Sequence, residues 1–444
     1  MRARLLSAFA QINASYWFYP ALFAIIAFVM ALVTIHLDRA FAAELISSRD
    51  YLVPARPDGA STMLQVIAAT TIGVAATVFS ITIAAVAYAS GTYGPRLLTN
   101  FMENRGNQLA LATFIGTFVY AIMVLRTVRA EDEAPATTAG AVATALPGFV
   151  PQLSLVVATG LMLVSIAVLV YFLNHIPASI RINTVLEQIG QRLLRQIADR
   201  FPKSGSGAEQ IADARQGAPV AAEVAGYVEI IDYEGLQDIA CREDVVIILA
   251  TEAGDFLHPP MPLVHVCGPP LDTQSADDVR NCFALSGLRT PTQDLRFLLD
   301  ELVEIALRAL SPGINDPFTA MTALHWIGAA TAQLGGRVLR QEGGGLARDE
   351  AVPRVIPLMM DFAGYVAAGF GASRSAVATS RKAALTMYDA LENAARALNS
   401  RDRVEVLLSE GHALMAQTKD SLTGPDLVEV RARYLGFCQA LTNG

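Results

Sequence analysis

Four polar residues in the C-terminal half are the side chains best placed to bind a ligand: Arg289, Asp294, Asn315 and Asp316. An arginine can donate a forked pair of hydrogen bonds to an anion, and the N–H groups at a helix start also favour one. Pro317 suits a first helical turn, which makes Asp316 its N-cap. These residues are therefore candidates for an anion pocket, although a structural turn with a satisfied cap explains the same pattern more simply.

A second group consists of small residues, several with hydroxyls, that recur along one apolar stretch. They are Thr70, Gly73, Thr77, Ser80 and Ala84. Their spacing of i, i+3, i+7, i+10 and i+14 forms one stripe of a helix. Such a stripe lets membrane helices approach closely and hydrogen-bond, so helix packing is the plainer interpretation. The alternative interpretation is that the stripes of several copies together form the wall of a pore. Gly116 and Thr117, in the next apolar stretch, are candidates for the opposing surface under either interpretation.

Residues for other chemistry are scarce. The only loose candidates for metal ligands are His258, His265 and Cys267. Ordinary packing and turn roles explain these residues better, so we expect no metal and no cofactor. The four cysteines form no C-x-x-C pair, which suits a reduced, cytosolic environment. We find no phosphate-binding loop, dinucleotide fingerprint, zinc-protease motif or nucleophile elbow. We therefore expect no catalytic residues and no enzyme.

The composition indicates a membrane protein joined to an ordinary soluble part. Hydrophobic residues make up 53% of the 444 residues and charged residues 17%, and the mean hydropathy is +0.40. Four apolar runs, at about 17–35, 63–90, 109–125 and 150–173, are long enough to cross a bilayer and contain no charged residue or histidine. The net charge of −8 argues against a nucleic-acid partner. We expect a transmembrane domain over residues 1–175, in contact with lipid.

The loops predict the orientation. Arginines cluster at the N-terminus, between the second and third runs, and after the fourth, whereas the opposite loops are rich in acid. The positive-inside rule then places both termini in the cytosol of a bacterial inner-membrane protein. The first run resembles a secretory signal, but it is too long for one and Asp38 and Arg39 precede the apparent cleavage site, so we expect it to remain as a span. Gly94-Pro95-Arg96 begins a short segment with the pattern of an interfacial helix.

The pattern of the soluble half predicts an α+β domain. An amphipathic helix at 176–202 connects it to the membrane part, and a linker rich in small residues follows at 203–217. Strand signals then predict a small β module at 218–270. Periodic apolar positions predict a mainly helical part at 275–444.

One string carries a family resemblance. Leu310-Ser311-Pro312-Gly313-Ile314-Asn315-Asp316-Pro317-Phe318-Thr319-Ala320, with Arg289-Thr290-Pro291-Thr292-Gln293-Asp294 before it and Gly94-Pro95-Arg96 after the second run, resembles the DUF2254 family of predicted bacterial membrane proteins. The resemblance covers nearly the whole chain. It implies a four-span membrane region with a C-terminal soluble domain, and no activity.

These observations lead to one functional hypothesis and one alternative. We expect a homo-oligomeric inner-membrane channel or channel-like transport protein with a cytosolic regulatory domain, and a small anion or ion as its ligand. Coupled carriers usually need intramembrane charges, which the four runs lack. The alternative is a non-conducting, membrane-anchored sensor or scaffold whose soluble domain binds a ligand or a protein.

Overall fold

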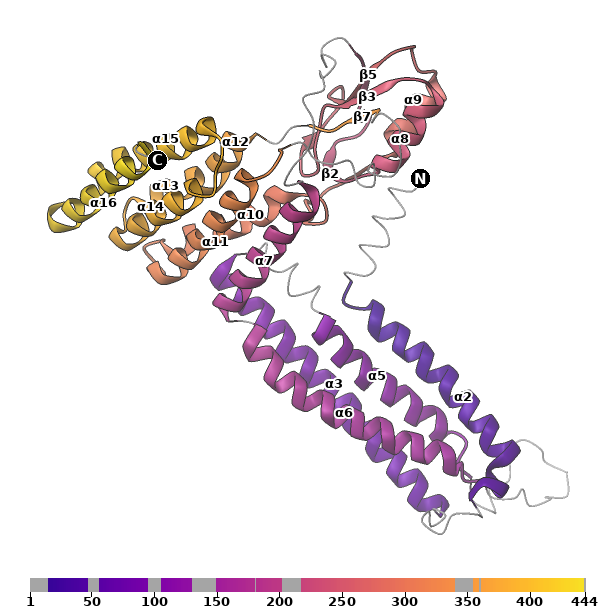
Figure 1. Cartoon of the computed structure of the whole chain (residues 1–444). Coiled ribbons are helices and arrows are strands. Elements are labelled where there is room, and N and C mark those ends of the chain that lie inside the picture. Colours follow the sequence, from indigo (N-terminus) through magenta and orange to yellow (C-terminus); the bar gives the residue numbers. More distant parts are fainter. Residues whose placement is uncertain are drawn as a thin grey trace, which may run out of the picture. The chain divides into compact units, whose positions relative to one another are not determined.

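The computed structural model describes residues 15–46, 56–94, 105–129, 149–179, 181–201, 217–339, 354–358 and 361–442. They form two compact units, Ile12–Ile180 and Arg181–Gly444, and Figure 1 labels their helices and strands. Most of the expected interfacial segment after Gly94 and of the expected linker at 203–217 lies outside the described residues.

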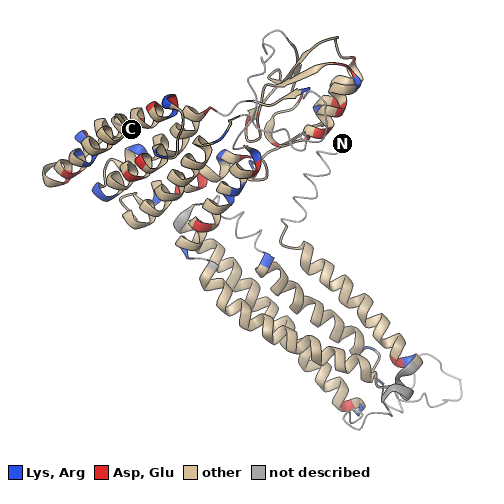
Figure 2. Cartoon of the chain, viewed as in Figure 1, with Lys and Arg blue, Asp and Glu red and all other residues tan. Residues whose placement is uncertain are grey.

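The first unit contains four long helices: α2 (Phe18–Ile46), α3 (Pro57–Tyr93), α5 (Arg105–Leu125) and α6 (Gln152–Ser179). Each is long and apolar enough to cross a membrane, with candidate spans Phe18–Ala40, Pro57–Gly91, Arg105–Leu125 and Gln152–Ala178. Charged side chains lie near the helix ends and the long middles carry none, as Figure 2 shows. The four expected spans are confirmed, and the helices extend beyond them because flanking polar residues continue the helical turns.

Helix α5 is the centre of this unit and packs on α2, α3 and α6. Its buried side chains include Phe114, Tyr120 and Val124. Hydroxyls connect the helices as well: Thr34 of α2 lies 2.8 Å from the Tyr120 hydroxyl, and Thr117 lies 3.0 Å from Ser165 of α6. In lipid such bonds join helices that have no hydrophobic reason to prefer each other over acyl chains.

The second unit begins with α7 (Ile182–Arg200). The connecting helix expected at 176–202 is divided, because Arg181 has an extended backbone (φ −67°, ψ 125°) and starts a new helix after α6 ends. The amphipathic part of the prediction holds for α7, whose buried side chains follow one face. These are Val185, Leu186, Ile189, Leu193 and Ile197. This face packs on α10 (Leu295–Ala309) and α11 (Pro317–Gly335).

The β-rich part has two small sheets. The first has the order β1 (Ala218–Ala221), β5 (Pro262–Cys267), β3 (Val246–Leu249), β7 (Val355–Ile356), antiparallel except for the β3/β7 pair. The second is antiparallel, with β4 (Phe256–Leu257) and β6 (Phe283–Ser286) on either side of β2 (Gly226–Ile231). Since β6 and β7 lie beyond residue 270, the β-rich part is larger than the expected module. β7 pairs with β3, which ends 106 residues earlier in the chain, and local strand signals do not reveal such a pair.

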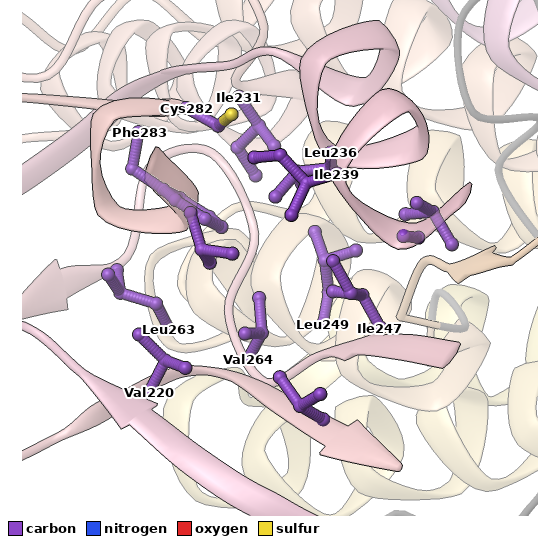
Figure 3. Close-up of a cluster of buried hydrophobic side chains, with 14 of the residues drawn as sticks. Val220, Ile231, Leu236, Ile239, Ile247, Leu249, Leu263, Val264, Cys282 and Phe283 are labelled. Carbon is purple, nitrogen blue, oxygen red and sulfur yellow. The ribbon is translucent and has the colours of Figure 1, made fainter. Parts of the chain in front are cut away.

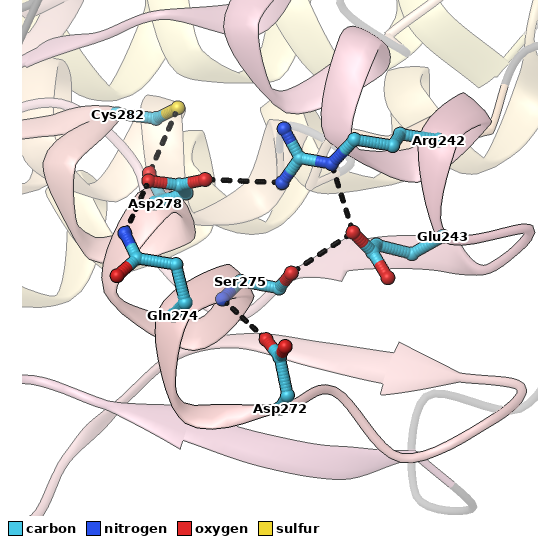
Figure 4. Close-up of polar contacts among 7 residues, drawn as sticks. All are labelled: Arg242, Glu243, Asp272, Gln274, Ser275, Asp278 and Cys282. Carbon is cyan, nitrogen blue, oxygen red and sulfur yellow. Dashed lines mark hydrogen bonds and ion pairs between the residues drawn. The ribbon is translucent and has the colours of Figure 1, made fainter.

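Two helices cover these sheets, α8 (Tyr233–Arg242) and α9 (Thr273–Asn281). Figure 3 shows Leu236 and Ile239 of α8 packed with strand residues in one core. On the surface, Arg242 bonds to Glu243 at 2.8 Å and to Asp278 at 3.0 Å, which connects the end of α8 to α9 (Figure 4). Such exposed pairs contribute little to stability.

The remainder is helical and follows α10 and α11. α12 (Phe362–Val366), the π-helical turn η2 (Ala367–Gly371) and α13 (Ala372–Val377) are continuous, and α14 (Arg381–Ala395), α15 (Arg401–Ser421) and α16 (Gly424–Thr442) complete the chain. The expected α+β class with a mainly helical C-terminal part is confirmed.

Candidate functional site

The small-residue stripe lies on the outer face of α3, directed away from the other helices of its unit. Thr70, Gly73, Thr77, Ser80 and Ala84 are all exposed. The opposite face of α3 is buried, for example at Leu64, Ile67 and Val78. The stripe therefore packs on no described helix of this chain, and its surroundings in a membrane are either lipid or another molecule.

The hydroxyls of the stripe are hydrogen-bonded within their own helix. Thr70 donates to the Val66 carbonyl at 2.7 Å, Thr77 to Gly73 at 3.0 Å and Ser80 to Ala76 at 2.9 Å. A hydroxyl that donates to the i−4 carbonyl still has acceptor capacity on its oxygen. The face can consequently meet an apolar surface without a lost hydrogen bond, or meet water or a cation through its oxygens.

The face is longer than the sequence pattern indicated. Further small and exposed residues continue it between and beyond the five expected positions: Ala69, Ala76, Ala87 and Gly91. From Ala69 to Gly91 the face measures about 33 Å at 1.5 Å per residue, which is about the thickness of a bilayer core. An added methyl group at Gly73 or Gly91 would have nothing within 4 Å. The alternation of these alanines with the hydroxyl residues is the signal that could have revealed them.

Gly116 and Thr117 do not form an opposing surface for this stripe. A Cβ at Gly116 would lie 3.4 Å from the Phe23 carbonyl of α2, and the Thr117 hydroxyl lies beside Ser165 of α6. Both residues serve contacts inside the unit, because α5 is its central helix. That expectation was wrong.

Asp38 is a buried acid, although it follows the first apolar run, where the sequence predicts an acid-rich loop. Helix α2 continues past the first apolar run, and the Asp38 carboxylate accepts hydrogen bonds from Leu153 N at 2.8 Å, Ser154 N at 2.9 Å and Ser154 Oγ at 2.6 Å. It is 5% exposed. Asp38 thus caps the start of α6 from a different helix, where a negative charge is favourable. Asp38 is four residues after Thr34 and therefore lies on the same face of α2. Because the Thr34 hydroxyl faces Tyr120 inside the unit, this spacing is the sequence signal for the burial of Asp38.

In the second unit, Arg289 and Asp294 meet at the start of α10. The Arg289 Nε and Nη2 lie 2.8 and 2.7 Å from Asp294 Oδ2, and its Nη1 lies 2.7 Å from Asp300 Oδ2. The other oxygen of Asp294 accepts from Phe297 N at 3.0 Å, so Asp294 is also the N-cap of α10. Burial raises the pKa of the Asp294 carboxyl, against the lowering effect of Arg289.

The surroundings of Asp294 are tight and largely structural. Gly254 has a φ of +99°, and a Cβ there would overlap the Asp294 carboxylate. Next along the chain, the Gln293 side chain accepts from Ile231 N at 2.8 Å and donates to Ile231 O at 3.3 Å, while Arg200 donates to the Gln293 and Thr292 carbonyls. The segment Arg289–Asp294 therefore joins β2, α7 and α10.

Asn315 and Asp316 lie at the far end of α10 from Asp294. The helix between them has 15 residues, which corresponds to about 22 Å. Asp316 caps α11 by accepting from Phe318 N and Thr319 N, each at 3.2 Å, and from Thr319 Oγ1 at 2.6 Å. Asn315 adopts a positive φ of 49°, which asparagine tolerates. The four expected ligand-binding residues thus form two separate clusters, not one pocket.

The loose metal candidates form no metal centre. His265 and Cys267 lie on β5, whereas the His258 ring faces the Pro259 carbonyl at 2.9 Å on an exposed turn. Within the described ranges, no three His, Cys, Asp or Glu side chains are grouped to hold a metal ion.

Comparison with known proteins gives a family and no activity. The family described as "Predicted membrane protein (DUF2254)" matches residues 13–393. An uncharacterised protein of Mycobacterium bovis is 32% identical over 308 residues, which cover 66% of this chain and 56% of the relative. An uncharacterised protein of Mycobacterium tuberculosis matches to the same extent. The match spans about half the length of these curated relatives. No solved structure matches.

Proposed function

Since the chain belongs to the DUF2254 family of predicted membrane proteins, we propose that it forms a homo-oligomeric channel or channel-like transport protein of the bacterial inner membrane. Its second unit is then a cytosolic regulatory domain, and both termini lie in the cytosol. The arginine-rich N-terminus and the arginines after α6 support this orientation.

The observation that carries the proposal is the outer face of α3. Helices that face lipid usually present large apolar side chains, as α2 and α6 do at Ile25 (63% exposed), Leu163 (59%) and Val170 (64%). Helix α3 also exposes large side chains, such as Ile72, Phe79 and Tyr88. Between them, however, it carries a strip of exposed alanine, glycine, serine and threonine over a length of about 33 Å. Small residues give acyl chains little to pack against, but they let a second copy approach closely.

The same face suits the wall of a passage. Hydroxyl oxygens at Thr70, Thr77 and Ser80 can accept hydrogen bonds from water while their protons stay bound to the helix. Around a symmetry axis, a strip of small side chains leaves more space along that axis than the large side chains on either side of it. Water or a small ion would therefore be the transported class.

A second candidate function rests on the same hydrogen bonds. Because the hydroxyls are satisfied inside α3, the face can also pack dry against its symmetry mate. The protein would then be a non-conducting sensor or scaffold, with the cluster around Arg289 or the Asp316 turn in the second unit as its ligand or partner site.

Thiol labelling separates the two. Single cysteines at Ala76 and Ser80 test the face, Ile166→Cys on α6 controls for lipid exposure (Ile166 is 52% exposed), and Val78→Cys controls for burial (1%). Each is placed in a background with the four native cysteines replaced, and membranes are treated with a charged thiol reagent. For a channel we expect modification at positions 76 and 80 alone, and Ser80→Leu should block transport by excluding water.

The contrary result is equally specific. If positions 76 and 80 stay as unreactive as 166 and 78, and Gly73→Leu dissociates the oligomer, the face is packing and the scaffold replaces the channel. If positions 76 and 80 stay unreactive and Gly73→Leu leaves a monodisperse protein of unchanged mass, the face is simply exposed to lipid and both candidates fail.

A further inference from the structure

The turn between α10 and α11 exposes large apolar side chains. Phe318 is 62% exposed and Ile314 is 42% exposed. They flank Asn315 and Asp316, and Pro312 and Gly313 beside them are exposed as well. The capping bonds of Asp316 explain the shape of the turn, but they give no reason for apolar side chains in water.

Helix packing fixes which end of the helical part carries this turn. Gln333 of α11 donates to the Leu194 carbonyl of α7 at 2.9 Å, and Arg337 donates to the Ala198 carbonyl at 3.1 Å. Earlier in both helices, a Cβ at Gly190 would overlap the Trp326 ring. These pairs advance together, so α7 and α11 run parallel.

The register is close enough to place the turn. Gly190 is eight residues into α7 from Ile182, and Trp326 is nine residues into α11 from Pro317. By this pair, the first residue of α11 is level with the first residue of α7 to within about 2 Å. The Gln333–Leu194 and Arg337–Ala198 pairs place the two residues level to within about 6 Å. Packed helix axes lie about 8–10 Å apart, so the exposed turn is a near neighbour of the start of α7.

The chain itself keeps the start of α7 close to the bilayer. The last large apolar residue of the α6 run is Leu173, α6 ends at Ser179, and α7 begins at Ile182. The six helical residues from Leu173 to Ser179 and three fully extended residues to Ile182 together span at most about 20 Å, so Ile182 lies within that distance of Leu173. That limit holds at any angle between α6 and α7.

A cationic side chain accompanies the apolar ones. Lys382, at the start of α14, has its Nζ 4.2 Å from the centre of the Phe318 ring. Its neighbour Arg381 is already paired with Glu429 at 2.5 Å and Asp426 at 3.5 Å. A lysine on an exposed aromatic ring suits the border between acyl chains and anionic head groups, where aromatic rings and lysine side chains concentrate.

We propose that this surface, defined by Ile314, Phe318 and Lys382, docks on an anionic lipid surface. Phe318 and Ile314 insert at the level of the head groups, and Lys382 contacts lipid phosphates. Because α11 packs parallel to α7, the docked turn also holds α7. The helical part is then attached to the bilayer by this turn as well as by the chain that leads from α6. The proposal requires neither conduction nor oligomers.

Lipid-quenching fluorescence tests the docking. In the cysteine-replaced, full-length protein, Gly313→Cys carries a small fluorophore, and nanodiscs contain a quencher at the lipid head group. Gly313 is exposed beside Ile314, an added side chain there meets nothing within 4 Å, and Phe318 is kept. The matched control is Asp402→Cys, an exposed position at the other end of the helices, because neighbouring Arg403 bonds to Gly335 O at the C-terminus of α11 (2.7 Å). We expect strong quenching at 313 and little at 402 in nanodiscs that contain anionic lipid.

The charge requirement gives the second arm. Lys382→Gln, with Ile314 and the fluorophore site unchanged, should lower the ratio of docked to undocked protein about fivefold, the usual effect of one lysine near an anionic surface. Equal quenching at 313 and 402 would overturn the proposal. So would quenching at 313 that changes with neither the lipid charge nor Lys382→Gln. A disulfide between two Gly313→Cys copies without lipid quenching would assign the surface to a second copy and overturn it as well.

Discussion

Replacing Asp38 should weaken the membrane unit more than any other single polar change in it. Its carboxylate accepts three hydrogen bonds at the start of α6, and the side chain is 5% exposed. Alanine there removes a helix cap, which costs about 0.5–2 kcal/mol. It also leaves buried donors without their acceptor, at about 1–3 kcal/mol for such a group. We expect a total loss of about 2–4 kcal/mol for Asp38→Ala, and about half of that for Asp38→Asn because one acceptor oxygen remains.

The assay is reversible unfolding of the full chain in mixed micelles, followed by circular dichroism at increasing denaturing detergent. The matched control is Asp58→Ala, which removes an exposed acid from the first turn of α3. Exposed positions of this kind change stability by about 0.5 kcal/mol or less. If Asp38→Ala were no less stable than Asp58→Ala, the capping of α6 by α2 would be refuted.

Three further predictions concern the second unit. Asp316→Ala should lower stability by about 0.5–2 kcal/mol, and Asn or Ser should restore most of it; a stable Asn variant without function would instead indicate a ligand site. Gly190→Ala should cost about 1–3 kcal/mol by overpacking against α11, whereas Gly436→Ala, with open space around it, should stabilise by about 0.5–1 kcal/mol; equal melting temperatures for the two would contradict the α7–α11 contact. Burial raises the pKa of Glu410, despite a neighbouring arginine. The native state therefore holds this proton at a higher pH than the unfolded chain does, and its contribution to stability falls as pH rises from the usual carboxyl pKa toward the raised one. Glu410→Gln should flatten that part of the stability–pH curve, and an unchanged slope would refute the assignment.

The membrane part could be predicted because its signal is local. Four apolar runs without charge need no tertiary information to be recognised as spans. The depth of Asp38 could not be read this way, because an acid just beyond a span has the same sequence signature whether it faces water or caps another helix. Only the position of Ser154, 116 residues later, decides between the two.

The candidate site divided for a similar reason. Arg289, Asp294 and Asp316 are close in the sequence, and capping chemistry was readable at Asp316. A straight 15-residue helix between the two motifs nevertheless keeps them about 22 Å apart. The outer direction of the α3 stripe also needed tertiary information, because small residues suit an internal helix contact and an external one equally well.

The proposed channel requires that the α3 face lie at the centre of the assembled protein. The direct measurement is an experimental structure of the full chain in nanodiscs, determined without imposed symmetry. We predict a closed oligomer in which Gly73, Thr77 and Ser80 of every copy face the central axis. A monomer, or an oligomer whose α3 faces point outward into lipid, would contradict it.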